Sequence, residues 1–212
     1  MADERHVLVT GANSGIGLAT VLHLAEKGFR VTGSVRSKSK ADVVRTAADA
    51  AGVEVGTVLL DVTDAEACER VVAGLGTLHG LVNNAGYGLT GAIEDVPDDE
   101  ARAVLETMVL APMRLARLAM PAMREAGGGR IVNISSIYGR TATPLTGWYQ
   151  GSKHALEGLS DALRMEVAKD GIHVILVEPG GFKTNIWADL ERDLANREGS
   201  RYESAYQRIG GL

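Results

Sequence analysis

Three side chains with complementary acid–base chemistry lie close together in the sequence. If a helix begins near Trp148, Tyr149 and Lys153 stand at positions i and i+4 and share one face of it. An ammonium beside a phenol favours the phenolate, so we expect Lys153 to lower the pKa of Tyr149 from its usual value of about 10. Ser136 follows an apolar strand pattern at 130–135 that would bring its hydroxyl to the same site. The pattern indicates proton transfer, although a Tyr and a Lys at this spacing are more often plain surface neighbours.

A strand pattern near the N-terminus leads directly into a glycine-rich turn. Apolar residues 7–10 are followed by Gly11, Gly15 and Gly17, and then by a helical pattern at 18–27. Glycines permit a tight turn and close approach of the backbone, while free N–H groups at a helix start bind a pyrophosphate. The order of strand, glycine turn and helix therefore predicts dinucleotide binding, although ordinary turns also use glycine.

The residue at the end of the second strand pattern, 30–35, bears on the choice of cofactor. An acid there would bind the free 2′-hydroxyl of the adenosine ribose. This chain has Arg36 instead, with Lys38 and Lys40 close by, and these cations suit a 2′-phosphate. We therefore expect NADP(H) rather than NAD(H). The alternative is that the three basic residues form a solvated start to the next helix.

Polar residues also follow the third and fourth strand patterns. Asp61 comes after the strand at 55–60, where its carboxylate would accept from the adenine amino group or serve as a simple turn aspartate. Asp64 is placed to cap the helix expected at 65–75. The fourth strand pattern, from Gly80, ends in Asn83-Asn84-Ala85-Gly86. Amides there can tie neighbouring strand ends together, and for Asn83 we expect a structural role.

These motifs together resemble those of the short-chain dehydrogenase/reductase family, in that family's order and close to its spacing over residues 6–187. The resemblance implies a single α/β domain with a doubly wound parallel sheet, helices on both faces, and a nicotinamide cofactor. It also implies a Ser, Tyr, Lys site that interconverts an alcohol and a carbonyl on a small molecule. The motifs are Thr10-Gly11-x-x-x-Gly15-Ile16-Gly17, Asn83-Asn84-Ala85-Gly86, Ser136, Tyr149-x-x-x-Lys153 and Pro179-Gly180.

The same resemblance extends to cofactor contacts and assembly. Thr184 resembles the family residue that binds the carboxamide or phosphate of the cofactor. The helices at 99–125 and 154–169 are expected to pair across a subunit interface, which gives a homodimer or homotetramer. The residues expected to contact the cofactor are Gly11, Asn13, Ser14, Gly15, Ile16, Gly17, Arg36, Asp61, Val62, Asn84, Ala85, Gly86, Tyr149, Lys153, Pro179, Gly180 and Thr184.

The chain departs from the family pattern within the long helical segment at 99–125. Most members have an asparagine there that helps to hold a proton-relay water, and the corresponding register falls on Met108. Pro112 has no N–H to bond the carbonyl of residue 108, so we expect that carbonyl to be able to hold a water instead. The alternative is that Met108 only packs and Pro112 only bends the helix. A dinucleotide-binding regulator with little turnover is the rival function.

The C-terminal residues 185–212 are interpreted as a substrate lid and a shortened C-terminal segment. Trp148, Phe182 and Trp187 are expected to form an apolar wall that suits a hydrophobic substrate, with ordinary packing as an equal alternative. Family members continue into another helix and a seventh strand, whereas this sequence ends at Leu212, so it is either a shortened version of the fold or part of a longer protein. We therefore expect a sheet without that last strand.

Composition limits the other classes of function. The 212 residues suffice for one domain over 1–212, and a net charge of −5 without a basic run argues against nucleic acid or an anionic membrane as partner. Cys68 is the only cysteine and is expected to pack within a helix. The histidines show no metal-ligand spacing, and His154 is expected on a helix surface. No signal peptide or membrane-spanning run of about 18 apolar residues is evident, which predicts a cytoplasmic protein.

Overall fold

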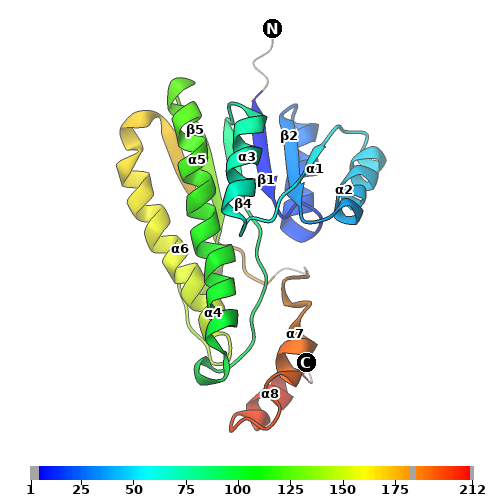
Figure 1. Ribbon diagram of the computed structural model, residues 1–212, viewed down its shortest axis with the longest axis vertical. Helices are drawn as coiled ribbons and strands as arrows, with labels where there is room; N and C mark the ends of the chain where they lie inside the picture. The colour runs from blue at the N-terminus through cyan, green and yellow to red at the C-terminus, as the bar shows by residue number, and fades with distance from the viewer. Residues whose placement is uncertain (1–4, 182–184, 211–212) are drawn as a thin grey trace.

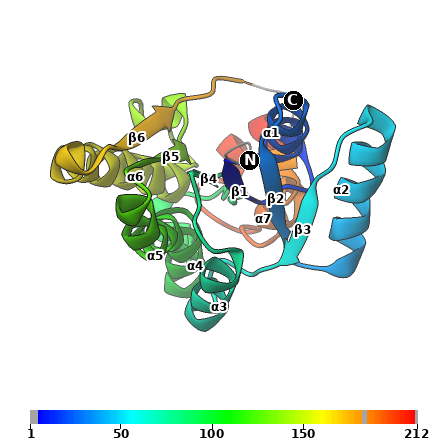
Figure 2. The ribbon, with the colours of Figure 1, turned by 90° about the horizontal axis from the view of Figure 1, so that it is seen from above.

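The computed structural model describes residues 5–181 and 185–210 and contains a six-stranded, entirely parallel sheet. The strand order is β3-β2-β1-β4-β5-β6, so the chain winds outward from β1 in both directions (Figure 2). This confirms the predicted doubly wound fold. The strands are β1 (His6–Thr10), β2 (Arg30–Val35), β3 (Gly56–Leu59), β4 (Gly80–Asn83), β5 (Gly129–Ile134) and β6 (Ile172–Val177).

Helices cover the sheet on both faces. Helices α1 and α2 lie against one face, and α3, α5 and α6 lie against the other (Figure 2). No helix in the described part of the chain is long and apolar enough to cross a membrane. The helices are α1 (Gly15–Glu26), α2 (Lys38–Ala51), α3 (Ala65–Leu75), α4 (Asp98–Leu105), α5 (Ala111–Glu125), α6 (Gly147–Glu166), α7 (Leu190–Ala195) and α8 (Glu203–Gly210).

The hydrophobic core consists of one layer on each face of the sheet. Within β1, Leu8 packs against α3 and α5, while Val7 and Val9 pack against α1 and α2. Successive strand side chains point to opposite faces, and a strand covered on both faces therefore has a nearly continuous apolar sequence. Burying each such side chain contributes about 1.5 to 3 kcal/mol, which anchors the strand that carries the glycine turn.

Local signals account for several helix ends. Asp64 caps α3 as predicted, because its Oδ1 accepts from the N–H of Ala67 at 2.9 Å. Ser37 caps α2 in the same way, by accepting from the N–H of Lys40. Helix α2 ends at Gly52, whose φ of 68° lies in the left-handed region that glycine adopts at low cost.

The helical segment predicted over 99–125 is present as α4 and α5, with a π-type turn between them that the sequence analysis did not specify. Helices α4 and α5 are joined by one wide π-type turn over Glu106–Leu110, in which the N–H of Ala111 donates to the carbonyl of Glu106. Pro112 is buried in the first turn of α5 and has no N–H of its own. The extra residue in the turn fits the helix around the N–H group that Pro112 lacks. Such turns occur frequently at functional sites.

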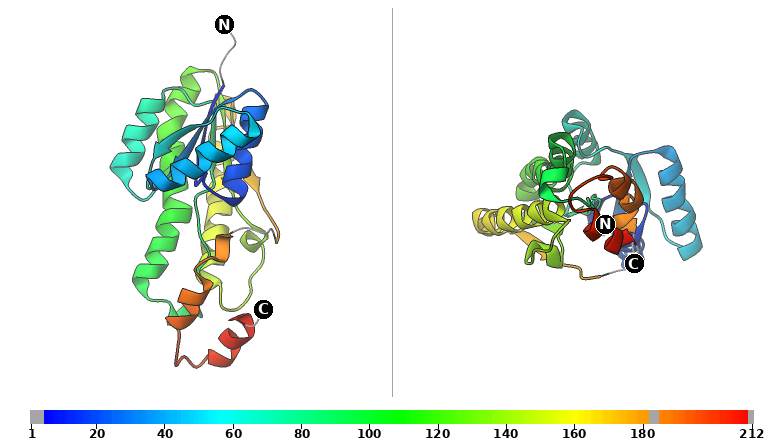
Figure 3. Two further views of the ribbon diagram at one scale, coloured as in Figure 1. Left: turned by 90° about the vertical axis from the view of Figure 1, so that its right-hand side faces the viewer. Right: turned by 90° about the horizontal axis from the view of Figure 1, so that it is seen from below.

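The C-terminal helices extend away from the sheet. Figures 1 and 3 show α7 and α8 beyond the carboxyl ends of the strands, at the same end of the molecule as α4. Within the described residues, β6 forms one edge of the sheet and β3 the other. The sheet thus presents its carboxyl edge toward the segment that the sequence predicts to be a lid.

Candidate functional site

The predicted site residues that the structure describes gather at the carboxyl edge of the sheet. In a parallel sheet the strands all end at the same edge, and a ligand crevice forms where the strand order reverses, here between β1 and β4. The residues that follow β1 to β6 in turn are Gly11, Arg36, Asp61, Asn84, Ser136 and Pro179.

Backbone conformation and close packing together explain the glycines after β1. Gly11 and Gly15 have φ values of 66° and 51°, which side chains other than glycine rarely adopt. Gly17 is needed for a different reason. A Cβ there would lie 2.3 Å from the carbonyl oxygen of Gly11 and 2.5 Å from Nδ2 of Asn84. The first turn of α1 therefore lies directly against the loop, as the sequence predicts.

The start of α1 can hold an anion. Ser14 occupies the N-cap position, yet its side chain makes no capping hydrogen bond, and the first turn of this twelve-residue helix contains no acid. Its leading N–H groups therefore lack the side-chain acceptor that usually satisfies them. A pyrophosphate would satisfy these donors and interact favourably with the helix dipole, so the residues present fit a dinucleotide.

Asn84 holds the glycine loop against the end of β4. Its Nδ2 donates to the carbonyls of Thr10 and Gly11 at 2.9 and 3.1 Å. In return, Oγ1 of Thr10 accepts from the backbone N–H groups of Asn84 and Ala85 at 2.9 and 3.0 Å. The observed role of the Asn84 side chain is thus to fix the cofactor loop, and a direct contact with the cofactor stays a prediction.

Asn83 has the structural role that the sequence favours. Its side chain is buried, and its Nδ2 donates to Oδ1 of Asn133 at 2.8 Å and to the carbonyl of Pro112 at 3.3 Å. Asn133 in turn donates to Oγ of Ser160 at 2.8 Å. This chain of amides ties β4 and β5 to α5 and α6. Sequence reasoning missed Asn133 and Ser160, although an asparagine within an apolar strand is a usable signal because a buried amide needs partners.

Asp61 forms the simple turn that the sequence left open as an alternative. Its Oδ1 accepts from the N–H and the hydroxyl of Thr63 at 3.0 and 2.7 Å. These two bonds hold the pKa of Asp61 below its ordinary value, and the cation of Arg36 adds to the effect. Arg36 is itself exposed, and its guanidinium is close enough to Asp61 to act on that carboxylate. A contact of either residue with the adenosine stays a prediction.

Ser136 and Tyr149 meet as predicted. Ser136 caps the short helix Ile137–Gly139 by accepting from the N–H of Tyr138 at 3.1 Å. Its side chain also hydrogen-bonds the Tyr149 phenol, which lowers the pKa of that phenol. Burial opposes this more strongly, however, and the pKa of Tyr149 is raised above its ordinary value.

Lys153 shares a buried helix face with Tyr149, which confirms the predicted geometry. Its Nζ lies 5.7 Å from the centroid of the Tyr149 ring and donates to the carbonyl of Ile134 at 2.8 Å. Burial lowers the pKa of Lys153 to about 8. The expectation of a phenol with a lowered pKa is wrong for this structure, because burial removes the hydration that stabilises the phenolate and outweighs the effects that favour it.

Apolar side chains surround Tyr149. Trp187 lies with its ring centroid 5.2 Å from that of Tyr149, and Trp148 packs in the same cluster. Met108 is buried there as well, against Gly86, where a Cβ would lie 3.0 Å from its Sδ. The Met108 side chain is therefore packed within this cluster, and a water on its carbonyl stays a hypothesis. Two of the three predicted aromatic residues line the cluster.

Some predicted residues lie outside the described part of the chain or carry little structural information. Phe182 and Thr184 belong to the segment 182–184, which is not described. The carbonyl of Pro179 accepts from the N–H of Ile137 at 3.1 Å, and this bond ties the loop after β6 to the loop that carries Ser136. Gly180 is exposed at the end of that loop.

The C-terminal segment is held by polar contacts to the loop that follows β4, a feature that sequence reasoning missed. Oδ2 of Asp193 accepts from the buried N–H of Thr90 at 2.9 Å. The hydroxyl of Tyr206 accepts from the N–H of Ala92 at 2.6 Å and donates to Asp95 at 2.7 Å. Burial raises the pKa of Tyr206 to about 12, so this hydroxyl keeps its proton at neutral pH.

We expect Tyr206→Phe to loosen α8 without unfolding the sheet. The change leaves the buried N–H of Ala92 without its acceptor, which costs about 1 to 3 kcal/mol. Hydrogen exchange across residues 203–210 should accelerate accordingly. Tyr202→Phe is the matched control, because the hydroxyl of Tyr202 bonds Glu94 on the exposed surface. Equal exchange rates in the two variants would show that the Tyr206 contact does not hold the segment.

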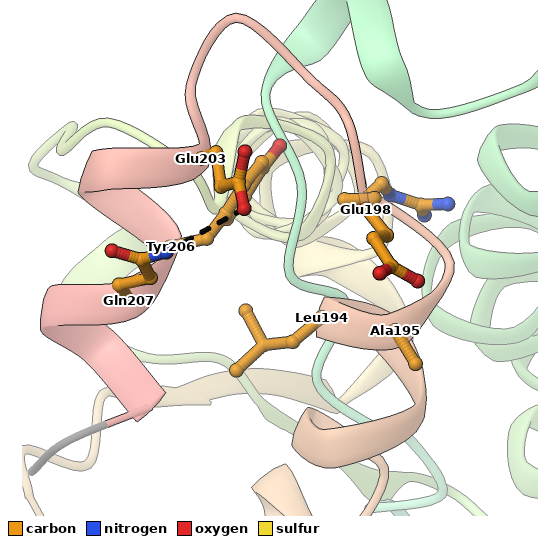
Figure 4. A pocket seen from close by; sticks show the side chains of 7 residues that line it. Leu194, Ala195, Glu198, Glu203, Tyr206 and Gln207 are labelled. Carbon is orange, nitrogen blue, oxygen red and sulfur yellow. Dashed lines mark hydrogen bonds between the residues drawn. The ribbon is translucent and has the colours of Figure 1, made fainter.

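A pocket of about 480 Å³ lies between α7 and α8 (Figure 4). Leu194 and Ala195 line one side of it, and Glu203 and Gln207 the other. None of the predicted catalytic residues lines this pocket.

Comparison with known proteins agrees with the arrangement of this edge. A family profile described as "short chain dehydrogenase" matches residues 5–195. The chain is 37% identical over 214 residues to an uncharacterized oxidoreductase, YusZ, of Bacillus subtilis, an alignment that covers 98% of this chain and 76% of that protein. It is also 37% identical over 185 residues to a 3-ketodihydrosphingosine reductase of Bacteroides thetaiotaomicron, which covers 84% of this chain and 64% of that protein.

A solved structure extends the similarity to three dimensions. The crystal structure of an actinorhodin polyketide ketoreductase with NADPH superposes with a TM-score of 0.86 at 33% sequence identity. The match covers 99% of this chain and 82% of that one. The glycine loop and the Ser136, Tyr149 and Lys153 cluster thus stand in a fold shared with an enzyme that was solved with its cofactor.

Proposed function

Since the chain belongs to the short-chain dehydrogenase/reductase family, we propose that it reduces a carbonyl group on a hydrophobic small molecule with NADPH. As a member of this family, the chain is an oxidoreductase that transfers a hydride between a nicotinamide cofactor and a carbonyl/alcohol pair. The observation that carries the finer proposal is the meeting of Ser136, Tyr149 and Lys153 beside the crevice, within an apolar cluster.

The proposed roles follow from the groups present. When bound, the reduced nicotinamide supplies the hydride, which bonds to the carbonyl carbon as the C=O π pair moves to oxygen. Tyr149 donates its phenolic proton to that oxygen, and Ser136 donates a hydrogen bond to it. Lys153 remains beside the phenolate so formed and favours its charge. Glycine-loop N–H groups and α1 hold the pyrophosphate.

The protonation state of Tyr149 favours the direction of reduction. Its pKa is raised by burial, so the phenol is neutral at neutral pH and carries the proton that reduction needs. Oxidation of an alcohol would require the phenolate, which burial disfavours. This asymmetry agrees with the names of two relatives, the 3-ketodihydrosphingosine reductase and an NADPH-dependent 3-dehydrocapnine reductase of Ornithobacterium rhinotracheale.

The preference for NADPH is assigned to Arg36. We expect Arg36→Ala to weaken NADPH binding about 10- to 100-fold, because a charge-assisted bond to the 2′-phosphate is lost, and to change NADH binding about twofold or less. Arg30→Ala is the matched control, since it removes the same charge from an exposed residue at the opposite end of β2. Dissociation constants for both cofactors test this. A parent protein that binds NADH more tightly than NADPH contradicts the assignment.

The substrate is proposed to be hydrophobic, because Trp148, Trp187 and Met108 cluster about Tyr149. Consumption of NADPH over a panel of ketones, aldehydes and quinones of increasing apolar length tests this proposal. Turnover should rise with apolar length. The rival function, a regulator that binds the dinucleotide without turnover, is not favoured by the reductase relatives. It would be supported if no member of the panel were reduced while NADPH still bound.

We also propose that the protein forms a homodimer or homotetramer, following the family resemblance of the helices at 99–125 and 154–169. Residues 185–210 are proposed to close over the substrate, because Trp187 already contacts the Tyr149 ring. Sedimentation velocity measures the assembly directly.

A further inference from the structure

A second ionisable side chain is buried one helical turn beyond Lys153. The carboxylate of Glu157 is only 4% exposed, and its Oε2 lies 2.7 Å from Nη2 of Arg140. Gly139 leaves the space for it, because a Cβ there would lie 2.9 Å from Cγ of Glu157. A buried carboxylate is costly unless cations accompany it. Its presence beside the site therefore needs an explanation.

Arg140 connects this carboxylate to the surface. Its guanidinium is about half exposed and also contacts Glu178, with Nη2 3.0 Å and Nε 3.2 Å from Oε1. Arg140 comes directly after the short helix that Ser136 caps, and Glu178 follows β6. The two ion pairs of Arg140 thus join the loops after β5 and β6 to Glu157 on α6, one helical turn beyond Lys153.

Lys153 and Glu157 are buried groups of opposite charge, and each favours the charged form of the other. Burial disfavours the ammonium of Lys153, whose pKa falls to about 8, and the carboxylate of Glu157 is the neighbour that raises it. The carbonyl of Ile134 is the hydrogen-bond acceptor of Nζ and has no formal charge. Without the carboxylate, little would hold a proton on this amine at neutral pH.

We propose that Glu157, anchored by Arg140, is a positioning residue that keeps the Lys153 ammonium charged and oriented beside Tyr149. The proposal rests on the proposed function, in which that ammonium stabilises the phenolate left after proton donation. Among the described residues, the charged and titratable groups around Lys153 are Tyr149, Glu157 and Asp161 on α6, Tyr138 and Arg140 in the segment after β5, and Glu178 after β6.

Titration of the lysine itself tests the proposal without any turnover. In protein labelled with ¹³C at lysine Cε, the signal of Lys153 is identified by its loss in Lys153→Met. It should titrate near pH 8 in the parent. In Glu157→Gln we expect its pKa to fall by about one unit, because burial is then unopposed. Glu157→Asp keeps the negative charge, so the pKa of Lys153 in this variant should lie close to that of the parent. The label also reports on the five other lysines, whose signals remain in Lys153→Met: Lys27, Lys38, Lys40, Lys169 and Lys183.

Two further variants guard against misfolding and against remote effects. Replacing Glu157 and Arg140 together with methionine removes both charges of the ion pair, so that no buried charge is left without its partner. The Lys153 pKa should fall there too. Glu178→Gln removes the outer, more exposed partner of Arg140. This variant should change the pKa of Lys153 by less than about 0.3 units. An unchanged Lys153 pKa in both Glu157→Gln and the double variant overturns the proposal.

Activity supplies the second readout. Loss of the Glu157 charge lowers the pKa of Lys153, so the alkaline limb of the kcat/KM profile for reduction, where the ammonium is lost, should move to lower pH. A residue that only supports packing would lower kcat/KM without moving that limb. If the lysine signal shifts as expected but no carbonyl is reduced, the proposed function fails while the electrostatic pairing stands. If carbonyls are reduced and the signal does not shift, the pairing fails alone.

Discussion

Tyr149→Phe should lower kcat/KM for carbonyl reduction by about 10²- to 10⁴-fold, the usual contribution of a positioned proton donor. The phenylalanine ring keeps the contact with Trp187 and the place in the apolar cluster, so only the hydroxyl is lost. The oxygen that gains charge as the hydride arrives then has no donor except Ser136. Steady-state rates of NADPH oxidation with an accepted ketone measure the loss.

The interpretation of that loss depends on two controls. The dissociation constant for NADPH should change by less than about twofold, because the α1 loop is untouched. Tyr138→Phe removes a neighbouring hydroxyl from a ring 6.2 Å away and edge-on to Tyr149, and it should leave kcat/KM within about threefold of the parent. Parental rates in Tyr149→Phe would remove Tyr149 from the mechanism.

Gly17→Ala should weaken the binding of both NADPH and NADH about 10- to 100-fold. The new methyl carbon would lie 2.3 Å from the carbonyl oxygen of Gly11 and 2.5 Å from Nδ2 of Asn84, and neither atom can move freely. The carbonyl is backbone, and the amide already donates to Thr10 and Gly11. Relieving the overlap displaces the loop at a cost of about 1 to 3 kcal/mol, part of which appears as lost affinity.

Gly74→Ala is the matched control for this prediction. Gly74 lies inside α3, and a Cβ there would meet nothing within 4 Å. Because alanine favours the helix more than glycine does, this variant should be more stable by about 0.5 to 1 kcal/mol and should bind cofactor like the parent. Isothermal titration gives the affinities and urea unfolding gives the stabilities. Cofactor affinity retained in Gly17→Ala would mean that the close contact at the loop does not shape the binding site.

Much of the architecture was predictable because its signals are local. Alternating or continuous apolar patterns gave the strands, with β2 and β6 at the expected residues and the others within one or two. The cap at Asp64 and the glycine turn depend on hydrogen bonds and φ values within a few residues, which sequence spacing largely determines. The shared face of Tyr149 and Lys153 follows from helix geometry alone.

Other features depended on residues far apart in the chain. The sequence indicated a lost hydrogen bond or a bend at Pro112, but it did not predict the π-type turn at Glu106–Leu110, because the form of that irregularity depends on how the helix packs. The contact of Tyr206 with Ala92 joins residues that no periodicity relates. The pairing of Arg140 with Glu157 likewise appears only once the loop after β5 lies against α6.

The sequence by itself determined the order of the elements, the glycine loop and the identity of the acid–base side chains, since each is encoded by residue type at short spacing. Only the tertiary structure decided their charge states. Spacing placed a cation beside Tyr149 and suggested an acidic phenol, yet burial raises the pKa of Tyr149 and lowers that of Lys153. Hydration is a property of the whole fold, because the atoms that exclude water from these two groups come from segments distant in the chain.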